Sequence, residues 1–319
     1  MKKQKNKQDK IPSEAQEFVN TRKKPAVFLF LASSMNLGHV VILRDMLRNK
    51  SFDELDVIIN SAGGDIHACF QIVQLLRMHS KKLNACVPFL AKSAATLLCV
   101  GADEIVLDEL AQLGPLDTQI FEEKKGGKRE YNSALNPFKT LEQLQKFSIE
   151  TLDIAVKMVV KRSRMDLDDC IKHAISFVGV TTGPLFSRLD PEKLGQYTRA
   201  LSVGTEYGNR LLRRYKKDWS EDKRTEVVER LVHGYPSHEY IIDYVELQEM
   251  GFDVSLFCAG EEQACGNLFN ILLEDKDYIA IVSPPAGESK KEEEHAKGST
   301  VPMGKTSYRG KAKKHRSKH

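Results

Sequence analysis

The sequence predicts an α/β fold in which a mainly parallel β-sheet carries crossover helices and is followed by a helical C-terminal region. The first observation is a set of continuous apolar runs, such as residues 26–31 and 55–60, which are typical of strands buried on both faces. The second is that segments with apolar residues at helical spacing separate these runs. Strands and helices that alternate in this way indicate parallel pairing.

The elements follow one another closely up to residue 107. We expect helices at residues 11–21, 36–49, 65–80 and 93–101, and strands at residues 26–31, 55–60, 83–90 and 104–107. Residues 119–136 are polar and predict an exposed loop. Beyond this loop, the pattern predicts helices at residues 140–162, 184–190, 191–215, 221–231 and 244–250, a strand at 254–257 and an apolar turn at 268–273. Pro191 is typical of a helix start, and Gly251 of a helix end.

The composition fits one large domain with polar ends. Hydrophobic residues make up 41% of the 319 residues, slightly below the usual globular share. Residues 1–10 and 283–319 are polar and charged, so we expect a disordered basic N-terminus and a disordered basic C-terminal tail around one domain at residues 11–282. The basic end of the tail, residues 305–319, is either simply solvated or makes weak contact with nucleic acid or another polyanion.

The sequence predicts a cytoplasmic protein. The basic N-terminus is not followed by an apolar segment, and the run at residues 26–32 is far shorter than the ~20 residues of a membrane-spanning helix. The six cysteines lack Cys-x-x-Cys spacing, which favours reduced thiols. We expect no metal site, because the histidines are scattered and the His-x-x-x-His pair, His315 and His319, lies in the basic tail.

Two short segments suggest chemistry. Residues 60–65 read Asn-Ser-Ala-Gly-Gly-Asp after an expected strand, and residues 91–96 read Ala-Lys-Ser-Ala-Ala-Thr at a second corner. Glycines allow backbone N–H groups to approach a ligand closely, and a serine at a nearby corner could present its hydroxyl to the same point. Acyl transfer needs this combination of a nucleophile with N–H donors for the oxyanion. Taken singly, each segment also fits an ordinary turn in which Asp65 or Ser93 caps a helix.

Three blocks in this order resemble the Clp/crotonase superfamily of serine proteases. They are Ser-Ala-Gly-Gly at residues 61–64, the segment from Ser93 to Ile105 that contains Ala-Asp-Glu-Ile, and Leu-Gly-Pro-Leu-Asp-Thr-Gln at residues 113–119. The sequence is most similar to the serine dehydrogenase proteinase family, and more distantly to signal peptide peptidase A and the proteolytic subunit of the Clp protease. The resemblance implies a Clp/crotonase-like peptidase domain and a serine-type endopeptidase.

The resemblance also implies roles for individual residues. Ser93 is the expected nucleophile, the backbone N–H groups of Gly64 and Ala94 are the expected oxyanion donors, and Gly63 keeps that corner open. It implies a peptide or protein substrate, hydrolysis without metal or cofactor, and a homo-oligomer.

The general base stays open at this stage. Relatives use either a Ser-His-Asp triad or a Ser-Lys dyad. This chain has no histidine at the position where the Clp peptidase carries its catalytic histidine. A triad of Ser93, His238 and Asp117 with exchanged positions is chemically sensible, because triads are defined by geometry. Lys139 is the alternative base, provided that it is desolvated.

Three weaker readings accompany these candidates. Lys128 lies in the charged loop, His233 is a second-choice histidine, and His238 could instead be a structural residue. Two rival functions also stay open: crotonase-like acyl-CoA chemistry, which uses the same oxyanion hole without a serine nucleophile, and a non-catalytic interaction scaffold.

Overall fold

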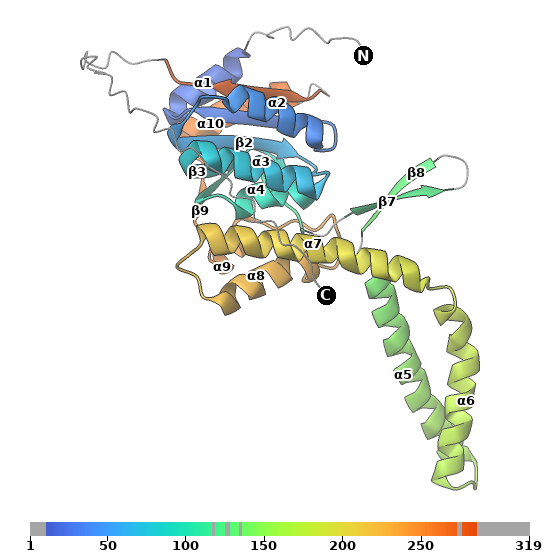
Figure 1. Ribbon diagram of the computed structural model, residues 1–319. Coiled ribbons are helices and arrows are strands. Elements are labelled where there is room, and N and C mark those ends of the chain that lie inside the picture. Colours follow the sequence, from blue (N-terminus) through green and yellow to red (C-terminus); the bar gives the residue numbers. More distant parts are fainter. Residues whose placement is uncertain (1–10, 117–118, 125–127, 134–135, 273–275, 286–319) are drawn as a thin grey trace, which may run out of the picture. The chain divides into compact units, whose positions relative to one another are not determined.

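The computed structural model describes residues 11–116, 119–124, 128–133, 136–272 and 276–285, the side chains of residues 119–133 excepted (Figure 1). The described residues up to Pro284 belong to one compact unit. Nearly all of the two expected tails lies outside the described residues, so their disorder and the predicted domain boundaries remain predictions.

The described part of the chain contains an eight-stranded sheet with the main order β10-β1-β2-β3-β5-β9, in which β4 pairs with β2 and β6. The strands are β1 (Ala26–Leu31), β2 (Phe52–Ser61), β3 (Ser80–Val87), β4 (Leu90–Ala91), β5 (Glu104–Leu107), β6 (Gln112–Leu113), β9 (Val254–Leu256) and β10 (Tyr278–Val282). Neighbouring strands are parallel, whereas β10 pairs with β1 in the antiparallel sense. The predicted α/β fold with a mainly parallel sheet is therefore confirmed.

Alternate residues of β1 enter two separate hydrophobic cores. Val27, Leu29 and Leu31 pack in the larger core with residues of α2 (Leu37–Leu47), α3 (Ile66–His79) and α4 (Thr96–Val100). Ala26, Phe28 and Phe30 pack in the smaller core with α1 (Ser13–Arg22) and α10 (Ala259–Leu272). Each buried large side chain contributes about 1.5–3 kcal/mol, which explains why these strands are apolar on both faces.

The remaining helices follow residue 133 and complete the helical region. They are α5 (Asn136–Arg162), α6 (Leu167–Phe186), α7 (Pro191–Tyr215), α8 (Glu221–His233) and α9 (Tyr244–Glu249). Asp190 caps α7 through the backbone N–H of Glu192, and Pro191 opens that helix as predicted. α5 packs against α6, and α7 packs against both α8 and α4 (Figure 1).

The structure differs from the expected elements most clearly in four places. The expected loop at residues 119–136 contains a β-hairpin, β7 (Gln119–Lys124) paired with β8 (Lys128–Ser133). The dipeptide Gly126-Gly127 between two short strand-forming runs is a hairpin signal that the charge of this segment obscured. In addition, α6 begins at Leu167 rather than at residue 184, α10 is a full helix rather than one turn, and β10 was not expected.

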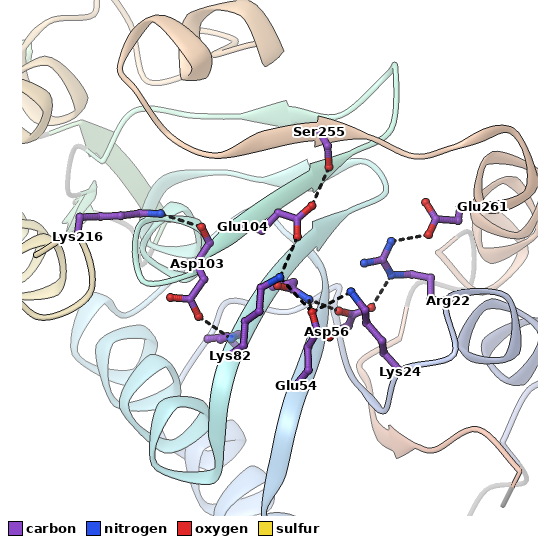
Figure 2. Close-up of polar contacts among 12 residues, drawn as sticks. Arg22, Lys24, Glu54, Asp56, Lys82, Asp103, Glu104, Lys216, Ser255 and Glu261 are labelled. Atoms are coloured by element: carbon purple, nitrogen blue, oxygen red, sulfur yellow. Dashed lines mark hydrogen bonds and ion pairs between the residues drawn. The ribbon is translucent and has the colours of Figure 1, made fainter. Parts of the chain in front are cut away.

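A network of charged side chains joins the sheet to α1 and α10 (Figure 2). Asp56 on β2 lies in register with Asn84 on β3 and, one strand further, Glu104 on β5. Buried Arg22, at the end of α1, pairs with Asp56 and donates to Glu261 of α10 at 2.8 Å. Removing one partner of such a buried pair costs about 3–5 kcal/mol, because the other charge is left uncompensated. The network therefore fixes the helices that cover this face of the sheet.

Candidate active site

A cavity of about 490 Å³ lies at the carboxyl ends of β1, β2 and β4. It is lined by Ala32, Ser33, Ser34, Met35, Asn36, Ala62, Gly63, Gly64, Asp65 and Ser93. These residues follow the last residues of three parallel strands, and such crevices are the usual ligand sites of open α/β sheets. The two segments that the sequence singles out therefore share one cavity.

The diglycine corner touches the serine corner directly. Gly63 and Gly64 have φ angles of 108° and 144°, which L-residues rarely adopt. A Cβ atom on Gly63 would lie 2.8 Å from the Cβ of Ser93, and one on Gly64 would lie 2.3 Å from the backbone nitrogen of Met35. Glycine is required at both positions because of the conformation and because of the lack of space.

Ser93 itself has a strained backbone. Its φ angle is 54°, in the left-handed region that costs a non-glycine residue about 1–2 kcal/mol. Ser93 begins the 3₁₀ turn η1 (Ser93–Ala95) between β4 and α4, with Lys92 rather than Ser93 at the N-cap position. Ser93 is buried, with 6% of its surface exposed, and it lines the cavity. A serine held at a sharp, strained strand-to-helix turn is the arrangement of the nucleophile in α/β-hydrolases, and a simple capping role does not account for it.

Backbone hydrogen bonds leave two N–H groups for a ligand. Gly63 donates its N–H to the hydroxyl of Ser61 at 3.1 Å, and Asp65 and Ala95 donate theirs to backbone carbonyls. No acceptor in the described part of the chain takes the N–H of Gly64 or Ala94. These are the two donors that the resemblance implies, and Gly63, which lies against Ser93, is the residue that it expects to keep the corner open.

Two buried side chains hold the serine turn in place. Cys69 on α3 donates its thiol to the carbonyl of Ala94 at 2.8 Å. The hydroxyl of Thr96 lies 3.0 Å from the carbonyl of Ala91 and 2.8 Å from that of Gly114, so it joins β4 to the segment after β6. Burial raises the pKa of the Cys69 thiol, which stays protonated and can keep donating.

The segment that carries His238 lies against the serine turn. The ammonium group of Lys92, the residue before Ser93, donates to the carbonyl of Glu239 at 3.2 Å. Further along the segment, Ile242 and Leu113 exchange backbone hydrogen bonds. His238 is half-buried, and in the sequence it lies between the buried Tyr235 and Glu239. Asp117, the third member of the expected triad, lies outside the described residues.

Lys139 and His233, the other candidate bases, lie in surroundings that differ from those of His238. Lys139 lies at the start of α5 with its side chain 47% exposed and its ammonium 3.4 Å from Glu142, so it lacks the apolar surroundings that a lysine base requires. His233 lies 3.8 Å from Glu229 and lines a different cavity beside α7 and α8. The side chain of Lys128 lies outside the described part of the chain.

Sequence reasoning missed one polar cluster on the rim of the cavity. Ser33 donates both its N–H, at 2.8 Å, and its hydroxyl, at 2.5 Å, to Asp277. His39 contacts the same carboxylate at 3.3 Å, while its other ring nitrogen accepts the N–H of Asn36. Partial burial alone would raise the pKa of Asp277, but the Ser33 and His39 contacts hold it below its usual value. The two serines after the first strand were the available signal, whereas Asp277 is too distant in sequence to have been assigned.

Two further results bear on function. Among the described residues, no group of three or more histidine, cysteine, aspartate or glutamate side chains is placed to hold a metal ion. A search of the described helices finds none with the length and apolar character that crossing a membrane requires.

The family comparison agrees with the motifs. Residues 35–145 match the family model of ClpP-like SDH-type serine proteinases. The match contains both corners of the cavity, Gly63-Gly64 and Ser93, and it extends to the start of α5. The resemblance predicted from the motifs is confirmed over this segment.

Two curated relatives of this chain are named as uncharacterized proteins. The chain is 26% identical to the uncharacterized protein MJ1495 of Methanocaldococcus jannaschii over 201 residues, which cover 63% of this chain and 52% of that protein. It is 38% identical to the uncharacterized protein MJ0137 of the same organism over 79 residues, or 25% of this chain and 28% of that protein. The chain thus spans about half or less of the length of these curated relatives.

Proposed function

We propose that the chain hydrolyses peptide bonds with Ser93 as the nucleophile, from the premise that residues 35–145 match the family model of ClpP-like SDH-type serine proteinases. One observation carries the proposal. The strained Ser93 turn touches the Gly63 corner, and the N–H groups of Gly64 and Ala94 beside it have no acceptor among the described residues. A hydroxyl and two N–H donors around one cavity suit a tetrahedral intermediate.

In the proposed reaction, the Ser93 Oγ attacks a substrate carbonyl and the two N–H groups stabilise the resulting oxyanion. The base removes the Ser93 proton and then gives it to the leaving amine, which leaves an acyl-enzyme. A water molecule attacks this ester in the same way and releases the second product. We propose His238 as the base and Asp117 as the group that orients it.

The position of its segment favours His238 over Lys139. The residue after His238 accepts a hydrogen bond from the residue before Ser93, which holds the two segments together. Lys139 instead forms an exposed ion pair with Glu142. Histidine is the side chain most often used as a general base at neutral pH, whereas a lysine base must first be desolvated.

The wider setting of this activity is also a proposal. We propose peptides or proteins as substrates, a chemistry that uses no metal or cofactor, and a homo-oligomer. The cysteines of the described residues are unpaired and five of the six are buried, which favours a cytoplasmic location.

A fluorophosphonate probe tests the nucleophile, because it reacts covalently only with an activated serine. We expect stoichiometric labelling of the purified full chain at Ser93, located by peptide mass spectrometry, and no labelling of Ser93→Ala. Ser34→Ala is the matched control, since Ser34 is an exposed serine that lines the same cavity. A folded chain that does not react between neutral and moderately alkaline pH would favour the scaffold. Turnover of acyl-CoA thioesters that survives Ser93→Ala would favour crotonase-like chemistry.

The labelling rate also tests the base. His238→Gln should slow labelling by about 10²–10⁴-fold, the usual contribution of general base catalysis, whereas Lys139→Gln should leave the rate unchanged. The reverse result would assign the base to Lys139 while leaving Ser93 as the nucleophile.

A further inference from the structure

The cavity that holds Ser93 contains a carboxylate that the proposed chemistry does not use. Asp65 directly follows Gly64, the proposed oxyanion donor, and it lines the cavity together with Ser93. Among the described residues that line this cavity, Asp65 carries the only charged side chain. Since neighbouring Cα atoms are about 3.8 Å apart, a substrate group that reaches Asp65 belongs to a residue close to the bond that is cleaved.

The cap of α3 uses only one oxygen of Asp65. The Oδ1 atom accepts the backbone N–H of His67 at 2.8 Å and that of Ala68 at 3.4 Å. No group in the described part of the chain donates to Oδ2, and the side chain is exposed. The backbone of Asp65 is fixed, because its N–H donates to the carbonyl of Met35 at 2.8 Å. The carboxylate is therefore held in one place with one oxygen directed to a ligand or to water.

The polar side chains beside Asp65 have already used donors that an anionic ligand would need. The hydroxyl of Ser33 donates to Asp277 at 2.5 Å, and the side-chain amide of Asn36 donates to the carbonyl of Ser34 at 2.9 Å. The carboxylate of Asp277 adds a second negative charge next to Ser33 on the rim of the cavity. Both carboxylates would repel an anionic side chain of a substrate and attract a cationic one.

The walls of the cavity suit a long side chain with a polar end rather than a bulky apolar one. Their apolar part consists of the exposed alanines Ala32 and Ala62 and of Met35, which is only 1% exposed. A leucine or phenylalanine side chain would therefore find little apolar surface to cover. Lysine and arginine instead have a hydrocarbon stem that packs on small apolar groups while the charged end stays in polar surroundings. The cavity volume of about 490 Å³ is large enough for such a side chain.

We propose that Asp65 selects peptides with a lysine or arginine side chain beside the bond that is cleaved, an inference that rests on the proposed function of Ser93. The ammonium or guanidinium group donates to Oδ2 of Asp65, and the stem lies over Ala32 and Ala62. No lysine or arginine among the described lining residues competes for this carboxylate. Lys92, the residue before Ser93, directs its ammonium group to the carbonyl of Glu239 instead.

Cleavage of peptides with blocked ends tests this preference, because the varied side chain then carries the only charge. The set places lysine, norleucine or glutamate at each position near the cleaved bond, and norleucine keeps the stem of lysine without its charge. At one position, we expect kcat/KM to be at least ~5-fold higher for lysine than for norleucine, and lowest for glutamate. The advantage of lysine should shrink in high salt, which screens partly exposed charges.

Asp65→Asn should remove the preference and keep the helix cap, because asparagine and aspartate cap helices about equally well. The ratio of kcat/KM for lysine to that for norleucine should fall below ~2, mainly through KM. Asp45→Asn is the matched control, because Asp45 is an exposed aspartate of α2 that pairs with Arg44 and lies outside the cavity lining; its ratio should equal that of the wild type. If melting shows that Asp65→Asn is not folded, Asp65→Ser replaces it, since serine also caps helices.

The outcomes separate this inference from the proposed function. Equal kcat/KM for lysine and norleucine peptides in the wild type would overturn the inference, and so would a lysine preference that survives Asp65→Asn. Fluorescence anisotropy of the same peptides on Ser93→Ala measures the preference without a nucleophile. Tighter binding of lysine peptides to a chain that cleaves none of them would support the inference and contradict the peptidase. Fluorophosphonate labelling of Ser93 without any lysine preference would support the nucleophile and contradict the inference.

Discussion

At the scale of single residues, the site depends on close approach rather than on particular side-chain chemistry. The backbone of Gly63 contacts Ser93 because there is no side chain between them, and Ser93 has a left-handed φ angle that the surrounding contacts must stabilise. Cys69 and Thr96 supply part of that stabilisation through the carbonyls of Ala94, Ala91 and Gly114.

Gly63→Ala is expected to disable the site while most of the fold survives. Its Cβ would meet the Ser93 Cβ and the Lys92 carbonyl oxygen, each at 2.8 Å, and these backbone and Cβ atoms can move only by shifting the serine turn. We expect labelling of Ser93 by the fluorophosphonate probe to slow by at least ~10²-fold, the typical effect of losing an oxyanion donor. Thermal unfolding should show a loss of roughly 1–3 kcal/mol.

Gly260→Ala is the matched control for this substitution. Gly260 lies in α10, and nothing lies within 4 Å of where its Cβ would be. It should label at the wild-type rate and be slightly stabilised, because alanine favours a helix. Wild-type labelling by Gly63→Ala would show that the diglycine corner does not shape the site.

The sequence reveals some of these residues and hides others for a physical reason. Gly63, Gly64 and Ser93 lie within short motifs, so their types and order are visible. The strained φ of Ser93 and the contacts of Asp277 with Ser33 and His39 arise only when distant segments meet. The proposed pairing of Ser93 with His238 likewise joins residues far apart in the chain, and Asp117 and Lys139 keep the status of sequence predictions.

At the scale of elements, the polar row across β2 and β3 makes stability depend on pH. Folding lowers the pKa of Glu54 from 4.5 to about 2, first through the amide of Asn84 and then through Lys24 and Lys82. A carboxyl group with a lowered pKa in the folded state stabilises the fold above its ordinary pKa. That contribution is lost as the pH falls from about 4.5 towards 2.

Glu54→Gln should therefore remove stability at neutral pH but little in strong acid. Since the Glu54 side chain is 32% exposed, solvent screening reduces the effect to about 1–2 kcal/mol at pH 7. Urea unfolding at several pH values should show that the difference from wild type disappears near pH 2. Asp53→Asn is the control, because Asp53 pairs with Lys81 in an 88% exposed position and should contribute nothing measurable. A difference that persists unchanged to pH 2 would contradict this assignment.

The elements that sequence reasoning locates well are those that are buried over nearly their whole length. The strands Ala26–Leu31 and Glu104–Leu107 were predicted with their observed bounds, since their apolar runs end where burial ends. α6 was missed over most of its length because Val178, Val180, Thr181 and Thr182 are β-branched and disfavour a helix locally. Packing against α5 overrides that preference. β10 was missed because its pairing with β1 joins opposite ends of the domain.

At the scale of the whole molecule, the two ends of the sheet have different roles. Loops after the carboxyl ends of β1, β2 and β4 form the cavity, while the Arg22–Asp56 network lies nearer the amino ends of the strands. The charged side chains that stabilise the fold are therefore separate from the residues of the proposed active site. Substitutions in the network should change stability without changing the intrinsic labelling rate of folded protein.

The basic tail should be independent of both the cavity and the charged network. The described residues up to Pro284 form one compact unit, and residues 305–319 contain lysine and arginine but no acidic residue. A chain ending at Pro285 should keep the wild-type melting temperature and the labelling rate of Ser93, because the cavity and the charged network lie within the residues that remain. It should lose most of its affinity for a polyanion, measured as the salt concentration that elutes it from heparin.

Replacing Lys311, Lys313, Lys314 and Lys318 with glutamine keeps the length of the tail and should reproduce most of that loss, since such binding depends on released counterions and therefore on charge. Unchanged elution of both variants would show that the tail is only solvated, and a lowered melting temperature of the shortened chain would show that it belongs to the folded domain.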